Sequence, residues 1–345
     1  GTAYVTFDRH RDGDWNPYVF RTDDYGQTWQ DLSYGLPSGS INVILEHPDN
    51  AEVLFLGTEH AVYLSMNSGK DWVEFNSNLP TTLYDDMVIH PREKDLILGT
   101  HGRSFWVLDD TTPLAKWSES KDKPVHVYPI RSATLFHYWK DTSYRGQEEW
   151  TGPNPDFGAI ISFMVNSNYS EANIEISKRN KIIRKYTLPV NSGKIKRMSW
   201  DLRHPAPLFD ENNRKTPGLI KPKKSELLPI PPHSLDPQGP HVSPGLYTVK
   251  ISVGNESHTQ TVRVNGDPKL KLRTGDYRQR ENFLLELYAL HKSAFTMNQF
   301  LKEDIKESSK IMDNDDRKLI NLKAQQKKVN SISSGAMRLA REFQG

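Results

Sequence analysis

Acidic residues in turn-rich stretches are the first candidates for chemistry in this sequence. Two carboxyl groups carry out glycoside hydrolysis when they lie about 5–5.5 Å apart (retention) or about 6.5–9.5 Å apart (inversion). The acidic residues in predicted loops are Asp8, Asp14, Glu59, Asp85 and Asp86. No two of them are distinguished by their sequence context, so we do not expect this chain to catalyse a reaction on its own.

Four other residues are candidates for binding a ligand. His101 and Arg103 follow Gly99-Thr100 at the end of a predicted strand, where side chains can be presented to a ligand. The alternative is that both belong to a hydrogen-bonded turn with a structural role. Trp15 and Tyr84 offer aromatic faces that could stack on sugar rings, or could instead fill the seams between sheets.

The composition excludes several other kinds of site. The chain contains no cysteine, which rules out disulfides, thiolate metal ligands and thiol nucleophiles. Asp8, Asp12 and Asp14 lack the spacing of a calcium-binding loop, so no metal is predicted, and no phosphate-binding or dinucleotide motif indicates a cofactor. A net charge of +2 gives no reason to expect a nucleic-acid partner, and no apolar run reaches the length of about 20 residues that spans a membrane.

The stretch around which the first third of the chain is organised is Thr22-x-Asp24-x-Gly26-x-Thr28-Trp29. A carboxylate two residues before a glycine can accept backbone N–H bonds from a tight turn. The glycine supplies the positive φ that the turn requires, and the tryptophan covers the loop with an apolar face. This pattern, an Asp-box, predicts a β-hairpin with a structural role rather than a catalytic one.

The Asp-box and several other markers recur farther along the chain. A second, weaker box carries Ser65, Asn67, Gly69 and Trp72, with Trp72 lying 43 positions after Trp29. Other repeated pairs are Leu36-Pro37 with Leu79-Pro80, His47-Pro48 with His90-Pro91, and Gly57-Thr58 with Gly99-Thr100. Independent markers with one period indicate internal repeats, and a period of about 40–50 residues is typical of four-stranded propeller blades.

These boxes, the repeated turns and the stretch Gly99–Asp110 together resemble the closing blades of an Asp-box (BNR-repeat) β-propeller. The chain is similar to sortilin/VPS10-like proteins of bacteria, which are often labelled BNR-repeat glycosyl hydrolases. The resemblance covers the first third of the chain well and about the next 150 residues more loosely. The second box departs from the pattern at Asn67 and Asp71, and the third repeat lacks a box after Trp106.

The resemblance implies a binding or assembly function, with a peptide or glycan as ligand, in an extracytoplasmic (secreted or periplasmic) protein. The alternative that it implies is the C-terminal part of a glycoside hydrolase whose catalytic carboxylates lie mainly upstream. A sialidase would need an arginine cluster and a Tyr–Glu pair, which Arg103 and Tyr84 do not complete. A third reading, a purely structural cap, predicts no ligand at all.

Residues 1–118 are therefore expected to form about two and a half blades. The predicted strands are Ala3–Phe7, Tyr18–Thr22, Ile41–Glu46, Val53–Gly57, Ala61–Ser65, Asp86–His90, Asp95–Gly99 and Phe105–Asp109. Because Gly1 already lies in a repeat, we expect the native N-terminus to lie upstream. An incomplete propeller leaves sheet edges open. Upstream blades of the parent chain or another copy of this chain are the expected partners.

Residues 119–158 are predicted as a linker with short strands at Val125–Tyr128 and Thr134–His137, followed by a loop with Trp139, Tyr144 and Trp150. Residues 159–268 show the alternation of an Ig/fibronectin-III-like β-sandwich. Its expected strands are Ala159–Val165, Ala172–Ser177, Ile182–Leu188, Lys196–Asp201, Gly245–Val253 and His258–Val264, and its Pro/Lys-rich insertion spans 205–241.

Residues 269–345 are predicted to form a helical hairpin with a turn at Asp313–Asp316. Its first apolar seam is expected to consist of Phe283, Leu287, Leu290, Ala294, Met297, Leu301 and Ile305. Its second, weaker face is expected to consist of Leu319, Leu322, Val329, Ile332, Ala336, Leu339 and Phe343. Such a hairpin needs a partner surface, which could be the propeller, the sandwich or another copy of the chain.

Overall fold

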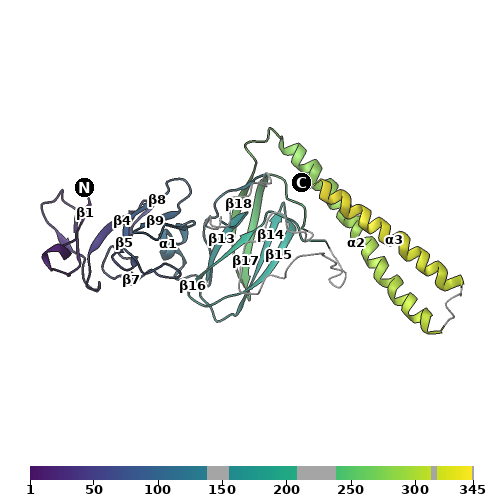
Figure 1. Cartoon of the computed structure of the whole chain (residues 1–345), viewed down its shortest axis with the longest axis horizontal. Helices are drawn as coiled ribbons and strands as arrows, with labels where there is room; N and C mark the ends of the chain where they lie inside the picture. Colours follow the sequence, from purple (N-terminus) through teal and green to yellow (C-terminus); the bar gives the residue numbers. More distant parts are fainter. Residues whose placement is uncertain (138–154, 208–237, 312–316, 344–345) are drawn as a thin grey trace.

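The computed structural model describes residues 1–137, 155–207, 238–311 and 317–343. Three sheets come first along the longest axis, then a unit of two further sheets, then a pair of helices (Figure 1). The prediction of a mainly β chain with a C-terminal helical region is confirmed. Trp139, Tyr144 and Trp150, most of the predicted insertion and the Asp313–Asp316 turn lie outside the described residues.

The first part of the chain contains antiparallel sheets of three, four and three strands. The first sheet is formed by β1 (Ala3–Phe7), β2 (Tyr18–Thr22) and β3 (Gln30–Asp31), with the short 3-10 helix η1 (His10–Asp12) between its first two strands. The second is formed by β4 (Ile41–His47), β5 (Asn50–Thr58), β6 (Val62–Ser65) and β7 (Val73–Glu74). The third is formed by β8 (Tyr84–Ile89), β9 (Leu96–Thr100) and β10 (Phe105–Leu108).

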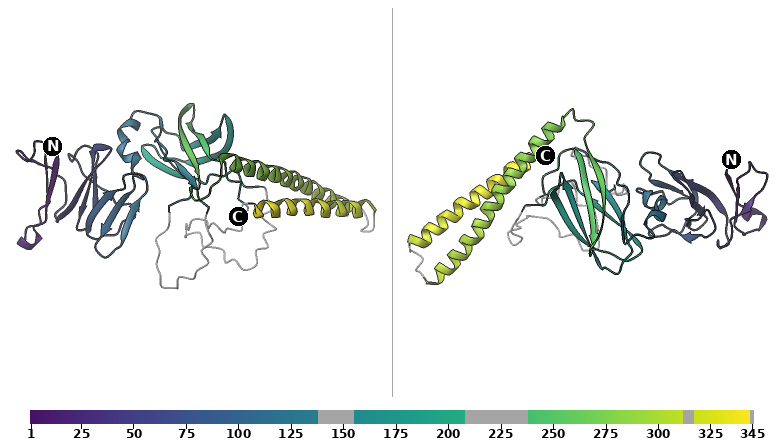
Figure 2. Two further views of the ribbon diagram at one scale, coloured as in Figure 1. Left: turned by 90° about the horizontal axis from the view of Figure 1, so that it is seen from above. Right: turned by 180° about the vertical axis from the view of Figure 1, so that it is seen from behind.

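Alternation of side chains along β5 explains how the three sheets stack. Successive residues of a strand point to opposite faces of its sheet. Leu54 and Leu56 belong to the apolar core shared with the first sheet. Val53 and Phe55 belong to the core shared with the third sheet. All four are buried, so the second sheet is covered on both faces, whereas the first and third sheets each pack on one face (Figure 2).

A short helical connection leads from the third sheet to the two-sheet unit. It contains α1 (Thr112–Ala115) and the 3-10 helix η2 (Trp117–Ser120). Arg131 of the following segment donates from Nη1 to the backbone oxygen of Glu93 (2.6 Å) and to Oδ1 of Asp95 (3.0 Å) in the β8–β9 turn. Arg197 donates to the backbone oxygen of Asp110 at 3.0 Å. These two arginines therefore join the third sheet to the unit that follows it.

Two sheets with one common core make up the next part. The smaller contains β11 (Val125–Val127), β13 (Ala159–Val165) and β16 (Lys194–Trp200), in the order β11-β13-β16. The larger contains β12 (Ala133–Leu135), β14 (Glu171–Lys178), β15 (Lys181–Pro189), β17 (Gly245–Val253) and β18 (Glu256–Gly266), in the order β12-β18-β17-β14-β15. Because β11 and β12 each pair within these sheets, the predicted boundary at residue 159 falls inside the unit and not at its start.

The centre of this core is a pair of aromatic rings, one from each sheet. Trp200 ends β16 and Tyr247 lies in β17, and their rings meet edge to face with centroids 5.2 Å apart. Both residues are fully buried. Trp200 donates from Nε1 to the backbone oxygen of Arg203, and the Tyr247 hydroxyl donates to that of Ser243. Each large ring is thus buried with its polar atom satisfied.

The helices are α2 (Thr274–Ile311) and α3 (Arg317–Glu342), which lie antiparallel (Figure 1). The predicted seam is wrong in part. Leu284, Leu287 and Ala340 form one buried cluster, and Ala294, Leu301 and Val329 form another, whereas Phe283, Leu290, Met297, Ile332, Leu339 and Phe343 are exposed. The sequence contains two adjacent apolar stripes, and only one of them faces the other helix. No helix in the described parts of the chain is long and apolar enough to cross a membrane.

A hydrogen-bonded pair with little exposure to solvent attaches α2 to the two-sheet unit. His204 Nε2 lies 2.7 Å from Oε1 of Glu281, and the backbone N–H of Ser243 donates to Oε2 at 3.0 Å. The side chains of His204 and Glu281 are 12% and 11% exposed. Glu281 therefore binds chain segments on both sides of residues 208–237.

Candidate functional site

The strand order places several connections at one edge of the three stacked sheets. Antiparallel strands put alternate connections at opposite ends of a sheet. The connections from β1 to β2, β5 to β6 and β9 to β10 thus share an edge with those that lead into β4 and β8. We call these segments, residues 8–17, 32–40, 59–61, 75–83 and 101–104, the loop edge.

Hydrogen bonds tie the loop edge together beside the first sheet. The backbone oxygen of Trp15 accepts from the hydroxyl of Ser38 and the backbone N–H of Gly39, both at 2.8 Å. The hydroxyl of Ser40 donates to Oδ1 of Asp8 at 2.7 Å. The backbone of Trp15 is therefore fixed while its side chain is 51% exposed. The ring of Trp15 is thus half exposed, and its role in ligand binding stays a prediction.

The Gly99-Thr100 pair shapes the loop edge beside the third sheet. The hydroxyl of Thr100 donates to the backbone oxygen of Ser104 (2.6 Å) and accepts from the backbone N–H of Arg103 (3.1 Å). The hydroxyl of Thr58 makes the matching bond to the backbone oxygen of Ala61, at 3.0 Å. The repeated Gly-Thr pair thus closes a tight turn in two sheets, and the turn after Thr100 is one residue longer than the turn after Thr58.

This turn presents the two polar residues that the sequence singled out. The side chains of His101 and Arg103 are both exposed. His101 Nδ1 lies 3.5 Å from Oδ2 of Asp85 at the start of β8, and the backbone N–H of His101 donates to the backbone oxygen of Leu83 at 2.9 Å. The structure therefore shows the hydrogen-bonded turn, while a role of the two exposed side chains in ligand binding stays a prediction.

Tyr84 is not available to a ligand. The residue is fully buried in the core between the second and third sheets, and its hydroxyl donates to the backbone oxygen of Pro80 at 2.7 Å. Of the two roles considered for its ring, the structure shows the filling of a seam. A residue that sequence reasoning missed is Tyr34, which lies on the loop edge with 87% of its surface exposed. An aromatic ring between Ser33 and Gly35 in a predicted turn was the only signal that could have identified it.

The carboxylates of the first loop are held in their ionised form. The pKa of Asp8 is lowered to about 2 by the hydroxyl of Ser40 and by hydrogen bonds from His10. The pKa of Asp14 is lowered by the hydroxyl of Tyr18 and by hydrogen bonds from Asn16. The general acid of a glycosidase needs a raised pKa so that it keeps its proton at neutral pH. Asp8 and Asp14 are therefore unsuited to that role.

The Asp-boxes lie at the opposite edge, where they close the turns after β2 and β6. In the first box, Asp24 accepts from the backbone N–H and the hydroxyl of Thr28 at 2.9 and 2.6 Å. The hydroxyl of Thr22 donates to Asp24 (2.8 Å) and accepts from the backbone N–H of Gly26 (2.9 Å), and Gly26 has a φ of 88°. These bonds lower the pKa of Asp24 to about 2. Trp29 lies 3.7 Å from where a β-carbon on Gly26 would sit.

The second box keeps this geometry with the polarity of one bond reversed. Oδ1 of Asn67 accepts from the backbone N–H of Asp71 at 3.0 Å, and its amide donates to Oδ2 of Asp71 at 2.7 Å. The hydroxyl of Ser65 accepts from the backbone N–H of Gly69 at 2.9 Å. The two departures from the pattern therefore compensate each other. Trp72 donates from Nε1 to the backbone oxygen of Leu32, so its ring joins the second sheet to the first.

The described residues offer no candidate metal centre. No group of three or more His, Cys, Asp or Glu side chains in this part of the chain could hold a metal ion. The arrangement at the loop edge, with exposed aromatic rings, an imidazole, a guanidinium and ionised carboxylates, is suited to contacts with a ligand. Tyrosine, tryptophan and arginine are enriched in interfaces for this reason.

Comparison with known proteins agrees with the geometry. The Sortilin-Vps10 family, described as "Sortilin, neurotensin receptor 3", matches residues 17–179 of the chain. This range contains both Asp-boxes, most of the three stacked sheets and the strands β13 and β14. The match supports a sortilin/VPS10-like Asp-box propeller, as the sequence motifs predict. A search of the curated proteins finds no match to the chain.

Proposed function

We propose that this chain is the binding and assembly portion of an extracytoplasmic, sortilin-like Asp-box propeller protein, and that the loop edge contacts a peptide ligand. The observation that carries the proposal is the collection of accessible side chains from two sheets at that edge: Trp15, Tyr34, His101 and Arg103. The family match over residues 17–179 supports a binding role and the extracytoplasmic location.

The charges of the loop edge favour binding over glycoside hydrolysis. Asp8 and Asp14 have lowered pKa values, so both carry negative charge at neutral pH. Together with the cation of Arg103 they offer contacts to both signs of charge in a peptide. Exposed rings on a backbone fixed by hydrogen bonds lose little conformational entropy on binding. A glycan stacked on Trp15 is the other ligand class, and the experiment below distinguishes the two.

The test uses selection from a random peptide library, with a glycan array in parallel. The full chain is immobilised, and selected peptides are titrated by fluorescence anisotropy. We expect micromolar or tighter binding, weakened at least about tenfold by Tyr34→Ala or Arg103→Ala because central interface residues of these types dominate affinity. The matched control is Tyr25→Ala, since Tyr25 is 88% exposed but lies in the Asp-box at the opposite edge. Equal losses in Tyr34→Ala and Tyr25→Ala, or binding of glycans alone, would refute the proposal.

The assembly function rests on the outer faces of the first and third sheets. Phe7 is 48% exposed on the first sheet, and its ring contacts that of Phe20 with centroids 6.1 Å apart. Val88, Phe105 and Val107 are exposed on the third sheet. Apolar faces of this kind mark interaction sites. Further sheets, from the parent chain or from another copy, would cover both faces as the second sheet covers their inner faces.

Light scattering over a concentration series tests the assembly. We expect the isolated chain to associate through these faces, and Phe7→Ser combined with Phe105→Ser to shift the chain towards the monomer. The paired control is Tyr25→Ser, which changes an exposed ring outside both faces. A monodisperse monomer at every concentration would contradict the assembly role, and would leave the test of peptide binding unaffected.

A further inference from the structure

One face of the helical pair carries apolar side chains that remain exposed to solvent, although Phe283 at one end of it meets the ring of Phe343 edge to face. On α2, Phe283, Leu290 and Met297 recur every seven residues, one position before the buried residues of the interface. On α3, the exposed residues Ile332 and Leu339 lie seven and fourteen positions after Gln325, so all three share one side of the helix. Met297 and Gln325 line one groove, so both series lie on the same side of the pair.

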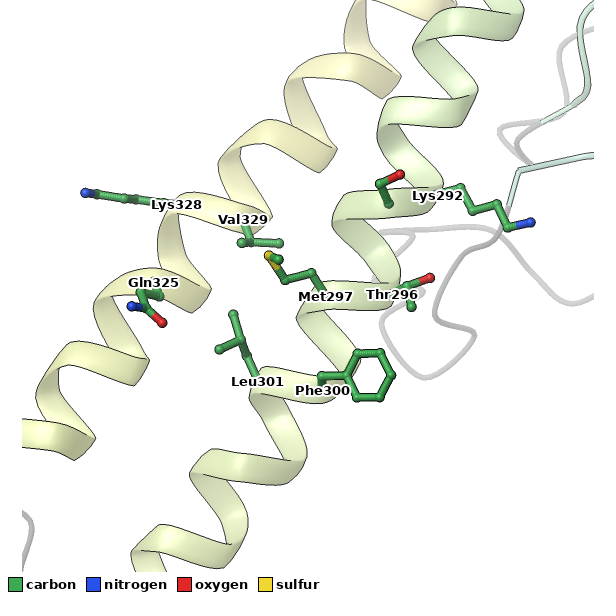
Figure 3. A pocket seen from close by; sticks show the side chains of 9 residues that line it. Lys292, Thr296, Met297, Phe300, Leu301, Gln325, Lys328 and Val329 are labelled. Carbon is green, nitrogen blue, oxygen red and sulfur yellow. The ribbon is translucent and has the colours of Figure 1, made fainter.

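This groove has a volume of about 850 Å³ and runs between the two helices. Figure 3 shows Met297 and Leu301 pointing towards α3, where Val329 meets them. Phe300, 64% exposed, lies on the outer side of α2. A helix with apolar residues at the interface and also one position before it has the pattern of a bundle helix with two neighbours. Among the described residues, α3 is the one helix that packs along α2, and the groove offers a place for a second.

The charges around the groove have one sign. Its lining contains Lys292 and Lys328 and no acidic residue. The two lysines extend to opposite sides of the groove (Figure 3). α3 contains seven Lys and Arg residues and a single acidic residue, Glu342, whereas α2 contains equal numbers of basic and acidic residues. An occupant of the groove is therefore favoured when it carries acidic residues beside an apolar stripe.

We propose that this face docks an acidic amphipathic helix of a partner protein, as the third helix of a bundle. The apolar series on α2 runs from Phe283 to Phe300, which corresponds to about 26 Å, or about 18 residues, of helix. The occupant would place apolar residues at heptad spacing against Met297, Leu301 and Val329, with acidic residues flanking them towards Lys292 and Lys328. This surface is separate from the loop edge and does not depend on the function proposed there.

A second copy of the chain fits the groove less well. In a two-fold dimer the same surface meets itself. The excess of positive charge on α3 would then meet either the other α3 or α2, whose charges balance. Neither arrangement neutralises it. Anionic lipid would also neutralise the charge, so vesicles are included in the test as the alternative occupant.

The probe is a synthetic 18-residue helical peptide with leucine at heptad positions and glutamate at the flanking positions, titrated into the full chain by fluorescence anisotropy. A second peptide carries lysine in place of every glutamate. Lys328→Glu and Phe300→Ser alter the groove. Their matched controls are Lys327→Glu and Ile320→Ser, which change exposed residues of the same types that do not line it. Far-UV circular dichroism checks that each variant keeps its helices.

We expect the glutamate peptide to bind with micromolar affinity, weakened about tenfold by Phe300→Ser and at least about fivefold by Lys328→Glu, with little change in the controls. Three results would overturn the proposal. The lysine peptide could bind equally well. Light scattering could show a dimer that Phe300→Ser and Lys328→Glu dissociate, which makes a second copy the occupant. Vesicles of phosphatidylcholine and phosphatidylserine could bind the chain, through the groove residues, where the peptide does not.

Discussion

Removal of the Glu281 carboxylate is the sharpest test of how the helices are held. In Glu281→Ala, the backbone N–H of Ser243, which is 2% exposed, loses its acceptor. His204 loses the oxygen that lies 2.7 Å from its Nε2. Both losses occur where water has little access, because the side chains of the pair are 12% and 11% exposed.

The cost follows from these two bonds. A buried amide without a partner costs about 1–3 kcal/mol, and a lost hydrogen bond to a charged group costs about 1.5–3 kcal/mol. Because one carboxylate serves both bonds, the two terms do not add fully, and we expect about 3 kcal/mol in total. At about 1.4 kcal/mol per factor of ten, the attachment of α2 should weaken roughly a hundredfold.

Native-state hydrogen exchange measures this effect at the right place, since a chain with several units need not unfold in one step. Protection at Ser243 and in the first turns of α2 should fall roughly a hundredfold in Glu281→Ala, while β13 and β17 change much less. The control is Glu286→Ala, which removes an exposed carboxylate from the same helix. Equal losses of protection in the two variants would refute the reasoning.

The same pair predicts a dependence on pH. Burial by itself would raise the pKa of Glu281, but hydrogen bonds from His204 and Ser243 outweigh it, so the pKa is lowered from its ordinary value of 4.5. A group with a lowered folded-state pKa contributes stability above its unfolded-state pKa and loses that contribution as pH falls through the folded-state value. The difference in protection between the wild type and Glu281→Ala should be constant above about pH 5 and should shrink below 4.5. A difference that stays constant into strong acid would contradict this assignment.

Two further predictions concern the stacked sheets and α3. Thr28→Asp should lower the melting temperature, because it places a second carboxylate against Asp24. Adding Asp24→Asn should restore the melting temperature, because it gives the first box the Asn–Asp pair of the second. Failure of this rescue would show that the bond from the Asn67 amide to Asp71 does not explain the second box. Gly57→Ala should lower the free energy of unfolding by about 1–3 kcal/mol, because its β-carbon would lie 3.0 Å from the backbone oxygen of Tyr84. Gly335→Ala, whose β-carbon would meet nothing within 4 Å, should stabilise α3 by about 0.5–1 kcal/mol. Denaturant titration measures both effects, and equal effects would refute the packing argument.

The Asp-box turns in the first third of the chain could be predicted from the sequence. The Asp-box bonds join residues two and four positions apart, such as Asp24 to Thr28, so the motif contains its own partners. The strands Ala3–Phe7, Tyr18–Thr22, Ala159–Val165 and Gly245–Val253 have the predicted bounds, because alternation of apolar residues is a property of one segment.

Other features depended on which surfaces meet. The apolar stripe through Leu290 and Met297 is as regular as the one that α3 covers, and periodicity does not say which of two adjacent stripes finds a partner. Tyr84 could not be assigned to a seam or a ligand site until the second and third sheets were packed. Bonds such as that between His204 and Glu281, 77 positions apart, follow from the path of the whole chain.

The turns and the class of the longer strands and helices are therefore predictable from local sequence, because they depend on residues within a few positions of one another. The tertiary structure decided which side chains form the loop edge, which stripe of α2 is left open and how α2 is attached. These depend on contacts between segments far apart in the chain, and the local pattern of one segment contains no information about the surface that will cover it.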